Sequence, residues 1–399
     1  MEVNEDVPEA HQEGDEEEEQ QQQVWSWGAG TDGQLGTGRL QDELLPQPLS
    51  LPAVSLLSCG GAHVVALSSG GRVLTWGRGS SGQLGHGEVV NHCLKPKPVT
   101  FPVSFPITHV SAGWSHSGFV SDTGRLFTCG DGSFGQLGHG DFSSHCCPVE
   151  VLYFASKNVG QVACGMRHSL VLLKGEIHSQ VYGFGSCKRG QIGSHDVRMK
   201  SVNIPQVIDG FKNIDIVSIS ANGDHSAALS ADGSLYYWGR GFPGSPDYHS
   251  PAQLDSSLVI KQVALGWNHS LILTDAGEVS MLGGRHHGIL SDPEKIGKNS
   301  FPAVADRREP ALERVPGLDG VKAVDISAGA EHSALVTEDG LTKTWGWGEH
   351  GQLGLGDTRD QILPQNVFLD QGQSNGGARC RVYCGSGFTY AIRTRNLFP

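Results

Sequence analysis

Residues 328–354 read AGAEHSALVTEDGLTKTWGWGEHGQLG and contain the two motifs that decide the fold. The motif Gly-x-x-His ends at His332, and Trp-Gly-x-Gly-x-x-Gly-Gln-Leu-Gly starts at Trp345. Variants of the second motif start at Trp27, Trp76, Cys129, Phe184, Trp238, Leu282 and Trp345. Variants of the first end at His63, His116, His168, His225, His269, His332 and, with the histidine replaced, Phe388. Successive histidines lie 44 to 63 residues apart, which predicts an array of seven similar supersecondary units.

Each unit has the pattern of short β-strands. Within one unit, residues 216–220 alternate apolar and polar side chains with a period of two, as a half-buried strand does. Asp232-Gly233 is a hairpin signal because glycine readily takes a positive φ. The aromatic stretch 234–239 is the return strand. With no helical period, this order predicts an all-β fold, a seven-bladed β-propeller of four-stranded blades.

The two ends of the chain complement each other. The chain opens on the strand at Trp27, with no Gly-x-x-His before it. It closes on residues 385–388, with no Trp-Gly strand after them. We therefore expect the N-terminal strand to complete the last blade and to close the ring, which leaves no strand edge unpaired.

Charge is concentrated at the N-terminus. The formal net charge is −13, and residues 1–23 hold ten acidic residues and no Lys or Arg. This Gln-rich segment has too little apolar surface to offset its ordering entropy, so we expect it to be disordered, with the propeller domain over 24–399. The rest of the chain is nearly neutral and has no basic stripe, so direct nucleic-acid binding is not expected. Residues 286–315 fall in the longest step and predict an exposed inserted loop.

The sequence also indicates the cellular compartment and the oligomeric state. No apolar run approaches the ~18 residues that a membrane span requires, and the N-terminus does not have a secretory core. Nine cysteines without a secretion signal are typical of reduced thiols. We therefore expect a cytoplasmic or nuclear monomer that does not bind a membrane.

The recurring glycines and histidines have structural interpretations. Gly28-x-Gly30-x-x-Gly33 fits a dinucleotide-binding pattern, but no helix follows it, so we interpret the glycines as turn residues. The histidines occur once per unit, too far apart to share a metal ion. Each is predicted to be a buried imidazole bonded to a neighbouring backbone carbonyl. His286-His287 is expected to be solvated.

The cysteines suggest no catalytic site. Cys59, Cys164 and Cys384 occupy a position where other units have alanine, so we expect small core residues. Cys146-Cys147 is expected in a loop, with a redox role the less favoured alternative. The sequence contains no nucleophile elbow, zinc-hydrolase helix or phosphate loop, so we expect neither an enzyme nor a cofactor or metal.

The paired motifs, in the form 328–333 and 345–354, resemble the signature of the regulator of chromosome condensation family. The resemblance covers residues 24–399 and implies a seven-bladed propeller whose N-terminal strand completes the last blade. Members differ in function. The founding member is a nucleotide exchange factor for the small GTPase Ran and docks on chromatin. A plant relative is a UV-B photoreceptor, and many others are adaptors or scaffolds.

The resemblance also implies where a partner binds. In the well-known relatives, the two residues before the motif histidine face the partner. Here these pairs are Trp114/Ser115, Met166/Arg167, Gly223/Asp224, Trp267/Asn268 and Ala330/Glu331. We select Trp114, Arg167, Asp224, Trp267 and Glu331 as candidate partner-binding residues, because aromatic and Arg side chains dominate protein interfaces. The alternative is that they are solvated turn residues.

The function that this favours is a protein-interaction scaffold that uses one face of the ring. The alternative is a guanine nucleotide exchange factor for a Ran-type GTPase, with Asp224 where the exchange factor uses an acid. The acidic tail favours a basic partner such as a histone over DNA. A UV-B photoreceptor is less favoured, because only Trp114 and Trp267 fit the Gly-Trp-x-His pattern and, three units apart, are not expected to stack.

Overall fold

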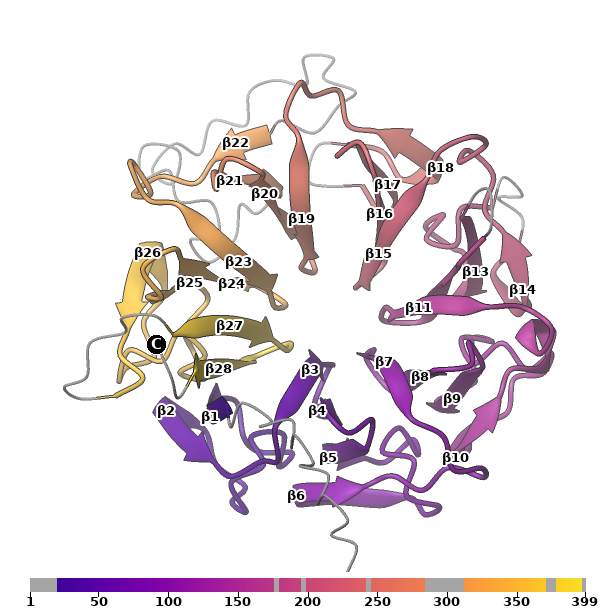
Figure 1. Cartoon of the computed structure of the whole chain (residues 1–399), viewed down its shortest axis with the longest axis horizontal. Coiled ribbons are helices and arrows are strands. Elements are labelled where there is room, and N and C mark those ends of the chain that lie inside the picture. The colour runs from indigo at the N-terminus through magenta and orange to yellow at the C-terminus, as the bar shows by residue number, and fades with distance from the viewer. Residues whose placement is uncertain are drawn as a thin grey trace, which may run out of the picture.

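The computed structural model describes residues 20–175, 179–194, 199–241, 245–283, 312–370 and 378–396. These residues form seven four-stranded antiparallel sheets arranged as blades around a central channel (Figure 1). The sequence-based prediction of an all-β, seven-bladed propeller is confirmed. One short 3-10 helix, η1 (Leu152–Phe154), is the helical element of the described residues. None of their helices has the length and apolar character that crossing a membrane requires.

Six blades are each built from four consecutive strands that run from the channel outwards. Blade 1 is β3 (Val54–Cys59), β4 (His63–Ser68), β5 (Val73–Gly79) and β6 (Val90–Pro98); blade 2 is β7 (Ile107–Ala112), β8 (His116–Ser121), β9 (Leu126–Gly130) and β10 (His145–Glu150). Blade 3 is β11 (Val159–Cys164), β12 (His168–Leu173), β13 (Gln180–Ser186) and β14 (Ser201–Val207); blade 4 is β15 (Ile216–Asn222), β16 (His225–Ser230), β17 (Leu235–Gly239) and β18 (Tyr248–Gln253). Blade 5 is β19 (Ile260–Leu265), β20 (His269–Thr274), β21 (Val279–Gly283) and β22 (Leu312–Arg314); blade 6 is β23 (Ala323–Ala328), β24 (His332–Thr337), β25 (Thr342–Gly346) and β26 (Gln361–Val367).

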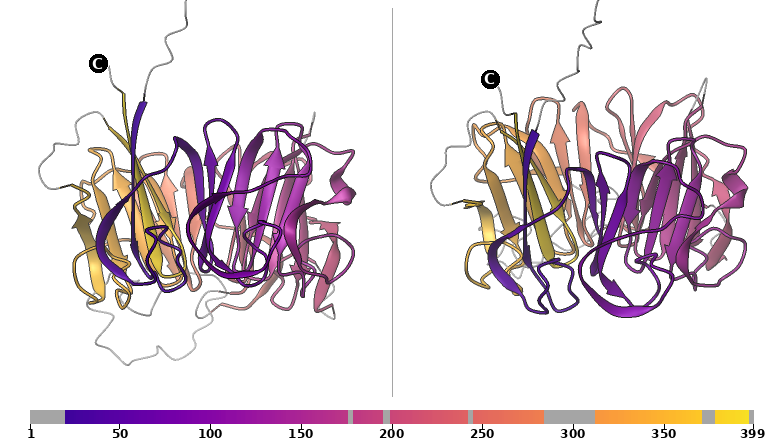
Figure 2. Two further views of the ribbon diagram at one scale, coloured as in Figure 1. Left: turned by 90° about the horizontal axis from the view of Figure 1, so that it is seen from below. Right: turned by 60° about the horizontal axis from the view of Figure 1, so that its bottom comes forward.

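The closing blade combines the two ends of the chain. β27 (Arg379–Cys384) faces the channel and pairs with β28 (Phe388–Asn396). β1 (Gln20–Gly28) pairs with β28 over nine residues, and β2 (Glu43–Leu49) is the outer strand. Figure 2 shows the start of β1 and the end of β28 at the same side of the ring. The predicted ring closure is confirmed.

Two sequence-based boundaries change. β1 begins at Gln20, so the ordered ring starts before the expected Val24, and residues 1–19 lie outside the described residues. The Gln22 amide donates to the Val54 carbonyl (2.9 Å), and the Val54 N–H donates back to Gln22 Oε1 (2.6 Å). Gln22 therefore links the closing blade to blade 1. This role was not predicted, because a polar, Gln-rich stretch does not indicate a strand.

The predicted loop 286–315 falls largely on residues 284–311, including His286-His287, which lie outside the described residues. Its last residues belong to blade 5 instead, because Leu312–Arg314 forms β22 against β21 and Val315 is buried. These residues pair through backbone groups, which need no apolar period.

The motif tryptophans are core residues between blades. Trp27, Trp76, Trp238 and Trp345 are fully buried, and Phe184 takes the same position in blade 3. Three of the indoles donate to the carbonyl of a loop glutamine of the preceding blade. These bonds run from Trp27 to Gln352 (2.9 Å), from Trp76 to Gln34 (3.2 Å) and from Trp238 to Gln191 (3.0 Å).

The Gly-rich loops pack tightly against the next blade. Gly354 has φ +69°, and a Cβ there would lie 2.8 Å from Nε1 of Trp27. Gln352 and Leu353 are 0% and 1% exposed. The interpretation of the glycines as turn residues, anchored by Gln and Leu, agrees with this packing.

Candidate functional site

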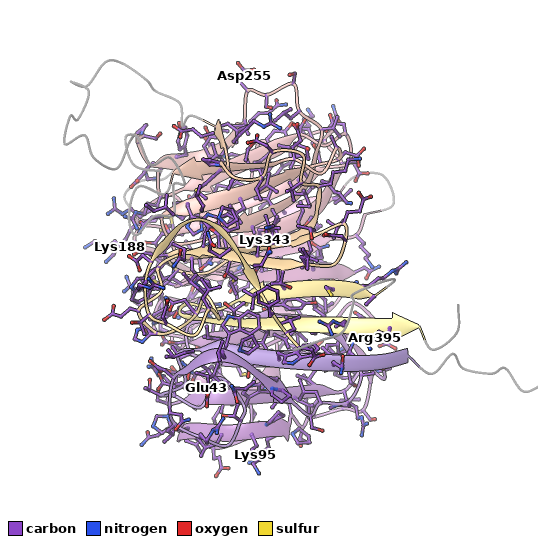
Figure 3. The ribbon with its side chains drawn as sticks, turned by 90° about the vertical axis from the view of Figure 1, so that its left-hand side faces the viewer. Glu43, Lys95, Lys188, Asp255, Lys343 and Arg395 are labelled. Atoms are coloured by element: carbon purple, nitrogen blue, oxygen red, sulfur yellow. The ribbon has the colours of Figure 1, made fainter. Side chains whose placement is uncertain are left out.

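The ring has two different ends. At the motif face, each first strand turns into the second through Gly-x-x-His, and each third strand leaves into the Gly-rich loop. At the hairpin face lie the tight turns between second and third strands and both ends of the described chain. Figure 3 places Lys188, beyond β13, at the motif side and Arg395, in β28, at the hairpin side.

The motif histidines join neighbouring blades. His225 bonds to a backbone carbonyl, but the other five bond to a Ser or Thr hydroxyl of the next blade, so the expected carbonyl partner is wrong for those five. The bonds run from Nε2 of His63 to Ser117, His116 to Ser169, His168 to Ser226, His269 to Ser333 and His332 to Thr389, at 2.9 or 3.0 Å. The general role, a buried structural imidazole, is retained.

Four of these hydroxyls also donate a hydrogen bond to the backbone carbonyl of a glutamine in a Gly-rich loop. The donors and acceptors are Ser117 to Gln83, Ser169 to Gln136, Ser226 to Gln191 and Thr389 to Gln352. Because each hydroxyl donates its proton to the carbonyl, it accepts from an Nε2–H of the histidine. We call the bond from histidine to hydroxyl, together with the carbonyl acceptor where there is one, the relay.

Burial keeps the relay histidines neutral. Desolvation lowers the pKa of His63, His168, His269 and His332 to about 3, and that of His116 to about 4. The motif glycine makes room for each ring. A Cβ on Gly329 would lie 2.1 Å from Cε1 of His332, so any larger residue there displaces the imidazole.

Blade 4 breaks this pattern. Asn222 stands where the other histidine units have the motif glycine, and the Nε2 of His225 bonds to the Trp267 carbonyl at 2.7 Å. Ser270, the hydroxyl that the relay would use, has no hydrogen-bond partner among the described residues. The Asn222 side chain instead donates to the Leu265 carbonyl (2.6 Å).

A collar of hydrogen bonds surrounds the channel at the motif face. Most of its links are backbone bonds from one Gly-x-x-His turn to the next. They run from Gly61 to Gly113, Trp114 to Gly165, Met166 to Gly223, Trp267 to Ala330, Ala330 to Ser386 and Ser386 to Gly60, at 2.8 to 3.2 Å. The Asn222 amide supplies the link from blade 4 to blade 5. The collar therefore links all seven blades at this face.

Two indoles meet across the channel inside the collar. The ring centroids of Trp114 and Trp267 are 5.1 Å apart, with an angle of 51° between planes. The expectation that they would not contact each other is wrong. Gly61 and Gly223, at the equivalent positions of the preceding blades, have no side chain and leave room for the rings. A pocket of about 130 Å³ lies at this end of the channel and includes both indoles and Met166 in its lining.

The other candidate residues lie at the same face of the ring. The Arg167 side chain is exposed, with its guanidinium 5.0 Å from the Phe134 ring centroid. Glu331 Oε1 accepts a hydrogen bond from the Asn268 amide (3.0 Å), beside Trp267. Trp114 and Trp267 are thus in contact. Glu331 bonds to Asn268, the residue next to Trp267. Arg167 lies on blade 3, against Phe134.

Asp224 is held by a structural partner. Its Oδ1 accepts a hydrogen bond from the Gln191 amide at 3.0 Å, and its carbonyl accepts from the Arg240 N–H at 2.9 Å. Arg189, bonded to Asp247 at 3.0 Å, interacts electrostatically with Asp224 as well. This carboxylate therefore lies in a mixed-charge environment rather than as an isolated acid.

Sequence reasoning missed Asn222 and the residues that follow the glycine of Trp-Gly or of its variants. Arg78, Asp131, Arg240 and Trp347 all occupy that position, and their N–H groups donate to the residue before the motif histidine. Both sets therefore lie at the same face. The signal was available, because these positions vary directly after a glycine that all seven units share.

The cysteines fall into two groups. Cys59, Cys164 and Cys384 line the channel end, and burial raises the pKa of Cys164 and Cys384 to about 12, so these thiols are protonated small residues as expected. Cys146 and Cys147 lie in β10 at an irregular register, so the expected loop position is corrected to a bulged strand. No group of three or more His, Cys, Asp or Glu in the described ranges is placed to hold a metal ion.

Comparison with known proteins agrees with the geometry. The family model described as RCC1-like domain matches residues 23–391. The chain is 32% identical over 387 residues to the Ultraviolet-B receptor UVR8 of Arabidopsis thaliana, covering 94% of this chain and 71% of that protein. It is 29% identical over 394 residues to the Secretion-regulating guanine nucleotide exchange factor of Mus musculus, covering 92% and 83% respectively.

A solved structure shares the fold. Prp20p of Saccharomyces cerevisiae, described there with its binding properties to Gsp1p and histones, matches with a TM-score of 0.78 and 22% identity. The match covers 94% of this chain and 92% of Prp20p. At this identity the likeness establishes the propeller alone.

Proposed function

The chain belongs to the RCC1-like propeller family, and on that premise we propose that it is a protein-interaction scaffold that binds its partner through the motif face. The Trp114–Trp267 contact is the observation that carries this proposal. Two half-buried indoles inside the collar offer a large apolar anchor, and the charged side chains of Arg167 and Glu331 lie at the same face. Such a centre with a polar rim is typical of protein interfaces.

The test is quantitative affinity capture from cell extract with the full chain as bait. Trp114→Ala combined with Trp267→Ala removes the anchor and is expected to reduce capture of the specific partner at least about tenfold, as for interface hot spots. The matched control is Val217→Ala with Val324→Ala, which changes two residues, 46% and 43% exposed, at the hairpin end of the inner strands. Retention by the tryptophan variant, or loss by the control alone, contradicts the proposal.

The second candidate is nucleotide exchange on a Ran-type small GTPase. It is supported by the relative that is named an exchange factor, and by Asp224 at the motif face. Release of labelled GDP from a panel of small GTPases tests it directly. Asp224→Asn keeps an acceptor for Gln191 but removes the charge, so exchange that depends on this acid falls, while Asp224→Glu is the charge-preserving control. A panel without any stimulated release excludes this candidate.

The indole contact also supports a third candidate, a response to UV-B light, which a relative's name suggests. Irradiation of the full chain at UV-B wavelengths would then change its tryptophan fluorescence and its size-exclusion volume. Trp267→Phe would abolish both changes. Identical profiles before and after irradiation exclude this candidate.

A further inference from the structure

A groove of about 740 Å³ lies between the closing blade and blade 1, on the outer side of the ring. Its walls come from β2 and β6, the outer strands of these two neighbouring blades (Figure 1). Leu49, Leu51 and Leu74 contribute to an apolar lining that also includes several prolines. It is thus an apolar cleft open to solvent, at the junction that closes the ring.

Three cations and no acidic residue line this groove. Arg39, Arg72 and Lys95 are all exposed, and Figure 3 shows Lys95 at the outer edge of the molecule. Arg39 forms an ion pair with Glu43 at 2.6 Å. No ion pair joins Arg72 or Lys95 to any residue in the described ranges. An apolar lining with uncompensated positive charge is complementary to an acidic peptide that also has apolar side chains.

The chain's own acidic segment is attached beside this groove. Strand β1 begins at Gln20, and Gln22 bonds to Val54, two residues beyond Pro52 in the groove lining. Residues 1–19 contain ten acidic residues and no Lys or Arg, together with Val3, Val7 and Pro8. Nineteen residues span up to ~60 Å when extended, which is more than enough to follow the groove.

We propose that this groove binds residues 1–19 of the same chain in an extended form. Acidic side chains pair with Arg72 and Lys95, and the valines contact the apolar lining. Because the segment is tethered, its effective concentration is of millimolar order, so weak ion pairs suffice. This contact should weaken as the salt concentration rises, and an acidic segment of another protein would compete for the groove.

Zero-length carbodiimide cross-linking of the full chain tests this proposal. The reagent joins carboxylates to lysine amines that are in contact, and peptide mass spectrometry identifies the joined residues. We expect links between residues 2–19 and Lys95 within a monomer. These links should fall at least about fivefold in 0.5 M NaCl, because exposed ion pairs are screened by salt.

A charge reversal supplies the matched comparison. Arg72→Glu leaves the amine of Lys95 in place and should reduce the same links about fivefold, as expected for an exposed ion pair turned into a repulsion. Lys212→Glu changes an exposed lysine on another side of the ring by the same charge and should leave the links unchanged. Far-UV circular dichroism confirms that both variants are folded.

The cross-linking results distinguish what occupies the groove. Links within a monomer that respond to Arg72→Glu support the proposal. Links spread over lysines of all blades, or equal loss in both variants, overturn it. Links found only between two molecules also overturn it, since they assign the groove to a second copy.

Discussion

The junction between blades 4 and 5 differs from the other histidine junctions of the ring. Between blades 1 and 2, His63 bonds to Ser117, which donates to the Gln83 carbonyl. Between blades 4 and 5, His225 bonds to the Trp267 carbonyl, and Ser270 has no partner among the described residues. Both junctions have the histidine and the serine, but the relay forms only between blades 1 and 2.

Two departures from the repeat account for this difference. Asn222 replaces the motif glycine, whose absent side chain elsewhere makes room for the imidazole. Blade 4 also lost its Gln-Leu-Gly, having Gly244-Ser245-Pro246 there, so Ser270 has no loop glutamine to donate to. The altered bond holds the backbone of Trp267, which is one half of the indole pair. The irregular junction therefore holds one of the two indoles of the candidate site.

The largest expected effect is that of pH, which acts on both kinds of junction. The pKa of the five relay histidines is lowered to about 3 or 4, against about 6.5 unfolded, so unfolding takes up protons below pH 6.5. Their stabilisation is complete above pH 6.5 and is lost as the pH falls towards 3. At pH 5.5 each should cost about 1 kcal/mol of unfolding free energy, measured by denaturant titration.

Removal of one relay histidine sharpens this test. His332→Gln keeps a side-chain donor but not the titrating group. The proton uptake on unfolding at pH 5.5 should fall by about one. An unchanged pH dependence in this variant would contradict the assignment of the buried imidazoles as its source.

The next effect concerns the motif glycine. Gly329→Asn copies the blade 4 residue into a regular unit, where its Cβ would overlap the His332 ring. We expect a loss of about 3 kcal/mol, because the ring is displaced and the bond to Thr389 is lost. Chemical denaturation measures it. Asn222→Ala loses two hydrogen bonds, to the Leu265 carbonyl and from the Gly223 N–H, without an overlap and should cost about 1–2 kcal/mol. Equal losses in the two variants would refute the steric explanation.

A smaller contrast is expected between two equivalent serines. Ser117→Ala leaves the Nε2–H of His63 and the Gln83 carbonyl without their partner, at a cost of about 1–3 kcal/mol. Ser270→Ala removes a hydroxyl with no partner among the described residues and should change stability by less than about 0.5 kcal/mol. Both residues are buried, so the pair is matched. Equal melting temperatures of the two variants would count against the relay.

The smallest effect is a repair of the irregular junction. Asn222→Gly restores room for His225 to reach Ser270 but removes the bond to Leu265, so stability should stay within about 1 kcal/mol. The Trp267 carbonyl would be released, and the indole pair would shift. Near-ultraviolet circular dichroism should register this shift, and an unaltered spectrum would separate the indole contact from the histidine bond.

Much of the fold could be predicted because its signals are local and repeated. The spacing of Trp-Gly and Gly-x-x-His, the hairpin glycines and the complementary chain ends together indicated a closed ring of blades. The exact start of β1 could not be predicted, because glutamines pair through backbone groups that every residue has. The candidate site was predicted as positions along the chain, while the partners of Asp224 and Glu331 come from other blades.

The amino-acid sequence by itself determined the number of blades, their strand order, the closure of the ring and the residues that stand at the channel end. The tertiary structure alone decided that Trp114 and Trp267 meet, that five imidazoles bond to hydroxyls, and that a cationic groove lies beside the start of β1. The physical reason is how far apart in the sequence the contacting residues lie. Repeats specify contacts between neighbours in sequence, whereas contacts across a ring depend on its diameter and on which opposing positions lack a side chain.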